Sequence, residues 1–191
     1  MFPDISSALL KREPFEHFLI PKAMNEISEL ECLDWFESHA PWRLTETDFY
    51  EQYEFSLLDI DLPSSISFLS SQVTLDALSE NLSKIFGVQF LPQVEITAHK
   101  LVRKQTIRIH NDFIEGAETH RVLLQLNRGW LEEYGGYLML FSGPEPDDLS
   151  NVVFPESGSI QGFAISPHSH HAVSTVHGGE RFTIVYSFFA K

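Results

Sequence analysis

The first half of the chain contains two stretches in which apolar residues recur at helical spacing. Residues 21–40 place apolar side chains three and four positions apart with acidic residues between them, and Pro21 stands at the start, where a missing N–H is tolerated. Residues 72–88 repeat the pattern, and Gly87 is a typical helix end. The pattern therefore predicts two amphipathic helices, over residues 21–40 and 72–88.

Beyond residue 93 the pattern changes to short runs of β-branched and aromatic residues, separated by clusters of Gly, Pro, Ser and acidic residues. Eight such runs follow one another: 94–102, 105–112, 120–127, 136–141, 151–155, 159–165, 171–176 and 181–190. Many short strands at this spacing are typical of sandwiches and barrels. We expect an α+β protein with a double-stranded β-helix (jelly-roll) core and the two helices packed on one outer face of a sheet.

Composition supports one folded unit. The chain has 191 residues, 43% of them apolar, with no internal repeat. We expect a single domain over residues 1–191, in which residues 1–93 form a mostly helical support and residues 94–191 the jelly-roll core. There is no apolar run long enough for a membrane span, no recognisable signal peptide, and a single cysteine, Cys32; together these favour the cytoplasm.

The net charge of −14 disfavours nucleic acid as a partner, because the chain would repel a phosphate backbone. The charge is typical of a solubilised surface, and it would also attract a basic partner such as a Lys- and Arg-rich peptide. A short basic run, Lys100, Arg103, Lys104 and Arg108, is more typical of a solvated face than of a nucleic-acid site.

The candidate chemistry begins at His110 and Asp112. Residues two apart in a strand share a face, so the imidazole and the carboxylate are expected to converge. Two histidines and one carboxylate form the facial triad of non-haem Fe(II) oxygenases, which leaves three metal positions open. The third ligand would come from a histidine-rich segment that offers His168, His170 and His171. Taken singly, these motifs are also common on ordinary protein surfaces.

The order of motifs, rather than any single one, carries a family resemblance. The series reads His110-Asn111-Asp112, Arg121 with a run ending at Asn127, Trp130, Gly135-Gly136, VFPESG with Phe163, His171-Ala172-Val173, and Arg181. In this series residues 94–190 resemble the catalytic core of the Fe(II)- and 2-oxoglutarate-dependent oxygenases, in their prolyl 4-hydroxylase-like branch. The resemblance implies that His110, Asp112 and His171 hold iron, with His170 and His168 as alternatives to His171.

The resemblance also implies a cosubstrate site. Arg181 is expected to pair with the distal carboxylate of 2-oxoglutarate, although a strand-end salt bridge is the plainer alternative. Gln125 stands where some relatives carry a tyrosine, and its amide is expected to contact the cosubstrate. Thr183 and Val185 share the face of Arg181 and are candidates to line the pocket.

Two further features are candidates for the substrate side. Arg108 lies two positions before His110, so it is expected to share that face and to meet an acidic group of the substrate; alternatively, it extends into solvent. Trp42 and the segment 45–55 are the expected material for a substrate-side lid.

The resemblance implies a dioxygenase that uses Fe(II), 2-oxoglutarate and O₂, with ascorbate as a candidate reductant. It would hydroxylate a C–H bond of a prolyl or other residue in a peptide or protein, or of a free amino acid or other small molecule. The alternative is a cupin-like metal-binding protein or isomerase without 2-oxoglutarate chemistry, a role that would leave Arg181 unexplained.

Overall fold

The computed structural model describes residues 4–191, which form two α-helices, eleven strands and four short 3₁₀ helices. The helices are α1 (Glu26–Ser38) and α2 (Gln72–Phe86), and the 3₁₀ helices cover Leu57–Asp59, Ser67–Ser70, Glu132–Tyr134 and Pro146–Asp148. The strands are β1 (His17–Ile20), β2 (Arg43–Glu46), β3 (Glu51–Ser56), β4 (Phe90–Leu101), β5 (Ile107–His110), β6 (His120–Leu126), β7 (Leu138–Phe141), β8 (Leu149–Val153), β9 (Ile160–Ala164), β10 (His171–Val173) and β11 (Arg181–Ala190).

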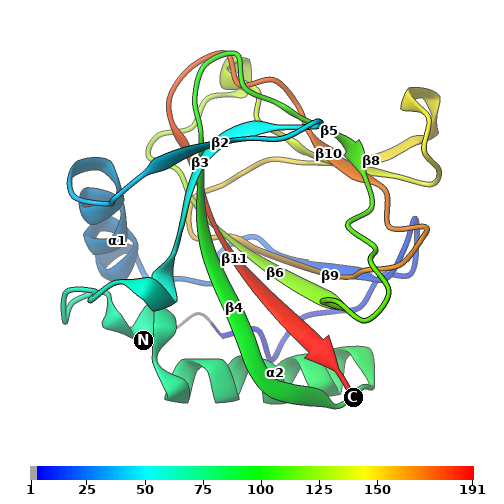
Figure 1. Ribbon diagram of the computed structural model, residues 1–191, viewed down its shortest axis with the longest axis horizontal. Coiled ribbons are helices and arrows are strands. Elements are labelled where there is room, and N and C mark those ends of the chain that lie inside the picture. The colour runs from blue at the N-terminus through cyan, green and yellow to red at the C-terminus, as the bar shows by residue number, and fades with distance from the viewer. Residues whose placement is uncertain (1–3) are drawn as a thin grey trace.

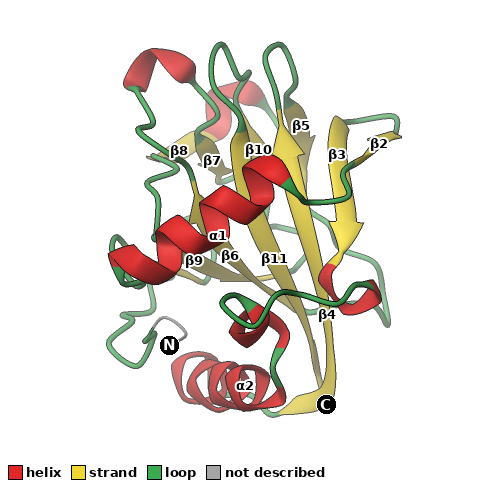
Figure 2. Cartoon of the chain, turned by 90° about the vertical axis from the view of Figure 1, so that its left-hand side faces the viewer, coloured by secondary structure: helices red, strands yellow, loops and turns green. Residues whose placement is uncertain are grey.

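The strands form two antiparallel sheets that face each other. The large sheet has the order β1-β9-β6-β11-β4-β3-β2, and the small sheet has the order β5-β10-β7-β8. Figure 1 shows both helices on one side of the large sheet and the strands of the small sheet on the opposite side. In Figure 2, α1 and α2 lie in front of the central strands of the large sheet. The predicted α+β class, with a jelly-roll core and helices on one outer face, is confirmed.

Strand alternation divides the large sheet into two buried faces. On β11, Phe182, Ile184, Tyr186 and Phe188 enter the core under the helices, together with Leu33 and Phe36 of α1 and Leu78 and Leu82 of α2. The intervening residues of β11, among them Val185, face the small sheet. Because both faces are covered, this strand reads as a nearly continuous apolar run.

Both helices form where the pattern predicts them, but α1 is shorter than predicted. The Asn25 side chain accepts a hydrogen bond from the Ser28 backbone N–H, so α1 begins after Asn25 and not at Pro21. Helix α2 ends at Gly87, which adopts the left-handed conformation (φ 72°) that glycine tolerates best.

All eight predicted strands are present, with adjusted ends. The pattern misses three others, β1, β2 and β3, so residues 4–93 are not mostly helical as expected but also build both edges of the large sheet. Strands β1 and β2 have only four residues each, too few to show a clear period. Their pairing with β9 and β3 stabilises them instead.

No helix within residues 4–191 has the length and apolar character needed to cross a lipid bilayer.

Replacing Gly162 of β9 by alanine is expected to destabilise the fold. A Cβ at this position would lie 2.2 Å from Cε1 of Phe18 on the paired strand β1, far inside van der Waals contact. Overpacking of this kind costs about 1–3 kcal/mol of unfolding free energy, which urea unfolding would measure. Shortening the opposing ring in the double variant Gly162→Ala/Phe18→Leu should recover part of the loss; equal losses in single and double variants would contradict the steric explanation.

His120 is expected to make the fold sensitive to acid. Its ring packs between Phe86 and Phe90, and burial lowers its pKa from 6.5 to about 4. The folded state therefore keeps His120 neutral where the unfolded state protonates it, so stability is full above about pH 6.5 and is lost as pH falls toward 4. A shift of this size corresponds to about 3 kcal/mol.

The variant His120→Leu should lose less unfolding free energy than the wild type between pH 7 and pH 4.5, as measured by urea titration. The exposed His39 provides the control, and His39→Leu should behave like the wild type. Parallel losses in wild type and His120→Leu would exclude His120 as the source.

Candidate functional site

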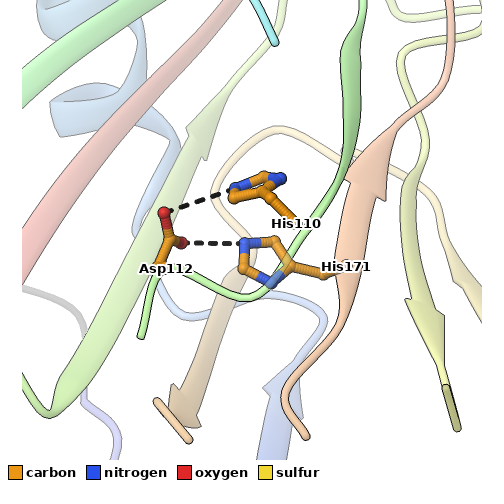
Figure 3. Close-up of side chains that lie close together, drawn as sticks. All are labelled: His110, Asp112 and His171. Atoms are coloured by element: carbon orange, nitrogen blue, oxygen red, sulfur yellow. Dashed lines mark ion pairs between the residues drawn. The ribbon is translucent and has the colours of Figure 1, made fainter. Parts of the chain in front are cut away.

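Three side chains from separate parts of the chain meet in the cavity between the two sheets. His110 ends β5, His171 begins β10, and Asp112 follows β5. His110 Nε2 lies 3.4 Å from Asp112 Oδ1, and His171 Nε2 lies 3.1 Å from Asp112 Oδ2. Figure 3 shows both rings directed at the carboxylate. Neighbouring ligands of an octahedral metal with bonds of about 2.1 Å stand roughly 3 Å apart, so the three groups fit one metal ion.

The backbone orients both imidazole rings for metal binding. His110 Nδ1 donates to the Arg108 carbonyl at 2.7 Å, and His171 Nδ1 donates to the Ser169 carbonyl at 2.8 Å. Because a carbonyl only accepts, the proton of each neutral ring stays on Nδ1 and the lone pair of Nε2 points to Asp112. Both rings thus present the ligand atom that a metal requires.

Asp112 is held as a carboxylate. Burial by itself would raise its pKa, but hydrogen bonds with His110 and His171 and the positive charge of Arg121 lower that pKa well below its usual range. Arg121, from β6, contacts Asp112 Oδ2 and also forms a two-point ion pair with Glu118. Asp112 has a left-handed backbone (φ 57°), which aspartate tolerates better than most residues.

Two exceptions to regular strand geometry surround the His110–Asp112 pair: a β-bulge in β5 before His110, and the left-handed backbone of Asp112 after it. The predicted strand 105–112 ends at His110. His171 of β10 pairs with His110 of β5, and Val173 pairs with Ile107. Two steps along β10 therefore correspond to three steps along β5, which contains the extra residue. The extra residue breaks the alternation, so Ile107 and His110 both line the cavity.

The expectation that Arg108 shares the face of His110 is therefore wrong. Arg108 is exposed and lines a neighbouring surface groove together with Arg103 and Lys104. The plainer alternative, an arginine extended into solvent, describes its position.

The structure separates the three histidines of the 168–171 cluster. His171 is buried and directed at Asp112. His168 is exposed, and His170, one residue before the ligand position, does not line the cavity. Of the three, only His171 joins His110 and Asp112 in a cluster able to hold a metal.

Arg181 lies in the same cavity as a buried cation. Its Nε donates to the Gly136 carbonyl at 2.8 Å and Nη1 donates to Thr183 Oγ1 at 2.7 Å. Burial lowers the pKa of Arg181 to about 10, so the guanidinium remains charged at neutral pH. No ion pair joins it to a carboxylate within residues 4–191, which excludes the plain salt bridge over that range. A buried cation of this kind is a binding site for an anionic ligand.

Glycine shapes the space around Arg181. Gly136 has a left-handed backbone (φ 67°), and a Cβ there would stand 2.9 Å from Arg181 Cδ and 3.1 Å from the Trp130 ring. The Gly135-Gly136 pair of the motif series thus leaves room for the guanidinium to lie against the turn.

Gln125 lies behind the cavity wall. It accepts a hydrogen bond from Thr183 Oγ1 at 3.0 Å and donates to Gln161 at 2.9 Å, and it is fully buried. Thr183 and Val185, both candidates for lining the pocket, do line the cavity. Within these contacts Gln125 orients Thr183 and, through it, Arg181; direct contact between Gln125 and a cosubstrate stays a prediction.

The cavity wall opposite the small sheet lies partly in the segment 45–55, which was expected as a substrate-side lid, whereas its residues on β4 were not predicted as part of the site. It consists of β3, β4 and the turn before β3, and its cavity-lining residues are Phe49, Tyr50, Gln52, Glu54, Thr97 and His99. The alternation of 51–56 and 94–102 was the available signal, since every second residue faces inward. Trp42, expected in a lid, instead stacks on Phe182 on the helix side of the sheet, with the ring centroids 5.6 Å apart.

The cavity occupies about 360 Å³, within the roughly 300–1,000 Å³ typical of small-molecule sites. Burial, followed by the charges of Arg121 and Arg181, lowers the pKa of His99 to about 3, so His99 is neutral at physiological pH. The cavity therefore combines a metal-binding cluster at one side with a fixed cation at the other.

Comparison with known proteins agrees with this geometry. Residues 96–189 match the family model of the 2OG-Fe(II) oxygenase superfamily. The chain is 28% identical over 178 residues to prolyl 3-hydroxylase OGFOD1 of Mus musculus, an alignment that covers 87% of this chain. It covers only 31% of that relative, so the chain spans about a third of the relative's length.

Solved structures share the fold. A prolyl-4-hydroxylase of Pseudomonas putida superimposes with a TM-score of 0.74 at 16% identity, covering 92% of each chain. A Trichoplax adhaerens prolyl hydroxylase, solved with a hypoxia inducible factor peptide fragment, gives a TM-score of 0.69 at 11% identity, covering 91% of this chain and 83% of the other. The protein thus belongs to the 2-oxoglutarate- and Fe(II)-dependent oxygenase superfamily and has the fold of its prolyl 4-hydroxylase-like branch.

Proposed function

We propose that the protein is an Fe(II)- and 2-oxoglutarate-dependent dioxygenase that hydroxylates a C–H bond. The observation that carries the proposal is the presence, in one cavity, of the His110–Asp112–His171 cluster and the unpaired cation Arg181. A metal site alone would also suit a cupin-like protein or isomerase, but that reading leaves the buried charge of Arg181 without a ligand.

In this proposal His110, Asp112 and His171 hold Fe(II) through two nitrogens and one oxygen, the donor set that non-haem iron prefers. Arg121 is a positioning residue, because its contact with Asp112 Oδ2 keeps the carboxylate turned to the two rings. With Fe(II) and 2-oxoglutarate bound, O₂ would be split so that 2-oxoglutarate gives succinate and CO₂ and the second oxygen atom enters the substrate C–H bond.

Arg181 binds and orients the cosubstrate. The guanidinium would form charge-assisted hydrogen bonds to a carboxylate of 2-oxoglutarate, and the Thr183 hydroxyl lies beside the guanidinium. Leu123, Leu138 and Val185 also line the cavity and make part of its wall apolar. Gln125 supports this arrangement through Thr183.

The substrate proposed is a prolyl or other residue in a peptide or protein, with a free amino acid as the smaller alternative. Support comes from the relatives named above, which are prolyl hydroxylases. Ascorbate is proposed as the reductant that maintains Fe(II), and the cytoplasm as the compartment. The exposed Arg108 remains a candidate for contact with a substrate outside the cavity.

Replacing His171 by alanine should weaken iron binding strongly. The variant loses one of three protein ligands, and affinity should fall on the order of 100-fold, since even the loss of a group that supports a ligand costs 10- to 100-fold. Anaerobic equilibrium dialysis with Fe(II) would measure this. His170→Ala removes the adjacent imidazole outside the cavity and should bind iron like the wild type. Equal effects of the two substitutions would argue against this ligand set.

Replacing Arg181 by alanine should weaken 2-oxoglutarate binding on the order of 100-fold while iron still binds, because the truncation removes a buried partner of an anion. The measurement is an anaerobic titration of the Fe(II)-loaded protein with 2-oxoglutarate, followed by visible absorbance. Arg128→Ala removes an exposed arginine and serves as the control. If wild type and Arg181→Ala bind 2-oxoglutarate equally, the dioxygenase assignment is wrong and the cupin-like alternative gains support.

A further inference from the structure

The cavity wall on β3 contains a buried amide oxygen that lacks a partner. Gln52 is 2% exposed and lines the cavity. Its Nε2 donates to Glu54 Oε2 at 2.8 Å, which assigns the amide orientation and leaves Oε1 as the acceptor atom. Within residues 4–191, Gln52 Oε1 has no hydrogen-bond partner. A buried acceptor without a donor is costly, so this oxygen marks a place where a ligand can donate.

The neighbouring Glu54 adds negative charge to the same place. Its side chain is 25% exposed, and no lysine or arginine of residues 4–191 forms an ion pair with it. The nearest basic group, His99 Nε2, is 4.0 Å away and belongs to a neutral ring at physiological pH. Gln52 Oε1 and the Glu54 carboxylate therefore form an acceptor pair, negatively charged, on the inner side of β3.

This acceptor pair does not suit the cosubstrate. 2-Oxoglutarate is a dianion, and a carboxylate wall repels it, whereas the buried Arg181 attracts it. Two groups of opposite charge thus line the cavity on either side of β4: Arg181 with Thr183 on β11, and Gln52 with Glu54 on β3. The acceptor pair remains for the second reactant, the substrate.

The acceptor pair is also connected to the metal cluster. Tyr50 precedes β3, lines the cavity and pairs with Ile107 of β5, three residues before His110. Phe49 packs on His110 with ring centroids 5.0 Å apart. A substrate seated against Gln52 and Glu54 would therefore lie in the same enclosure as the reacting centre.

We propose that Gln52 and Glu54 are the specificity-determining residues of this enzyme, and that they bind an N–H-donating nitrogen of the substrate. That the bound molecule is the substrate rests on the proposed function. That Gln52 and Glu54 bind an N–H donor does not depend on it. The nitrogen is either a cationic amine or guanidinium or a neutral peptide N–H, since both donate to an amide oxygen and to a carboxylate.

The test uses three small probes of similar size: N-propylguanidinium, N-propylacetamide and butyrate. Each probe is titrated into the full chain loaded with Zn(II) and 2-oxoglutarate, and binding is followed by ligand-observed NMR. Zn(II) replaces Fe(II) because it avoids paramagnetic broadening of the NMR signals. We expect at least one N–H-donating probe to bind about tenfold more tightly than butyrate. Glu54→Gln distinguishes the two sources, because it should weaken a cationic probe and leave the neutral amide nearly unchanged.

Gln52→Met is the main variant, and it should weaken the preferred probe about tenfold. Glu54→Leu tests the same wall independently if Gln52→Met fails to fold. The chain offers a matched control in Gln93 and Glu95, an exposed pair on β4 with the same spacing and the same Gln-to-Glu hydrogen bond, at 3.5 Å. Gln93→Met should leave all probe affinities unchanged.

Three results would each overturn the inference. Butyrate could bind as tightly as the N–H-donating probes, no probe could bind at all, or the probe affinities could be unchanged in both Gln52→Met and Glu54→Leu. Iron and 2-oxoglutarate binding are measured on the same wild-type preparation, and probe titrations are repeated without either. A wild type that fails to bind iron and 2-oxoglutarate but binds the probes through Gln52 would refute the proposed function alone. A wild type that binds iron and 2-oxoglutarate but does not bind the probes through Gln52 would refute only the inference about the acceptor pair.

Discussion

The large sheet buries both of its faces, and this constraint decides where the polar side chains of the cavity can lie. On β11, the residues between Phe182, Ile184 and Tyr186 must face the small sheet, because the helices cover the other side. Arg181 and Thr183 are therefore held inside the cavity by the packing of their apolar neighbours. The helices act on the site indirectly, since they determine which face of each strand points inward.

The buried charges of the cavity divide it into regions. Asp112 is surrounded by His110, His171 and Arg121, which keep it ionised and directed at a single point. Arg181, in contrast, has only neutral hydrogen-bond partners within residues 4–191, namely Gly136 and Thr183. A site with one satisfied anion and one unsatisfied cation is preorganised for an anionic ligand beside a metal, because little reorganisation is needed when that ligand arrives.

Local backbone exceptions, rather than regular strands, make the metal cluster. The bulge in β5 turns Ile107 and His110 to the same side and Arg108 away from it. Asp112 then reaches back through a left-handed conformation beyond the strand end. The alternation of a regular strand predicts correctly that His110 and Asp112 lie close together, but for a reason that does not hold, and it misplaces Arg108 by the same error.

The sequence by itself determined the two helices, eight of the strands, the jelly-roll class and the residue types of the candidate metal site, because these depend on local periodicity and on residue chemistry. Strands β1, β2 and β3 depend on pairing with distant partners, so short-range pattern does not reveal them. The motif order already favoured His171 over His168 and His170, and the tertiary structure showed its contact with Asp112. Only the tertiary structure decided that Gln125 stands behind Thr183 and that Gln52 and Glu54 line the cavity. Each of these depends on which strands lie opposite one another across the two sheets, and that information is spread over the whole chain.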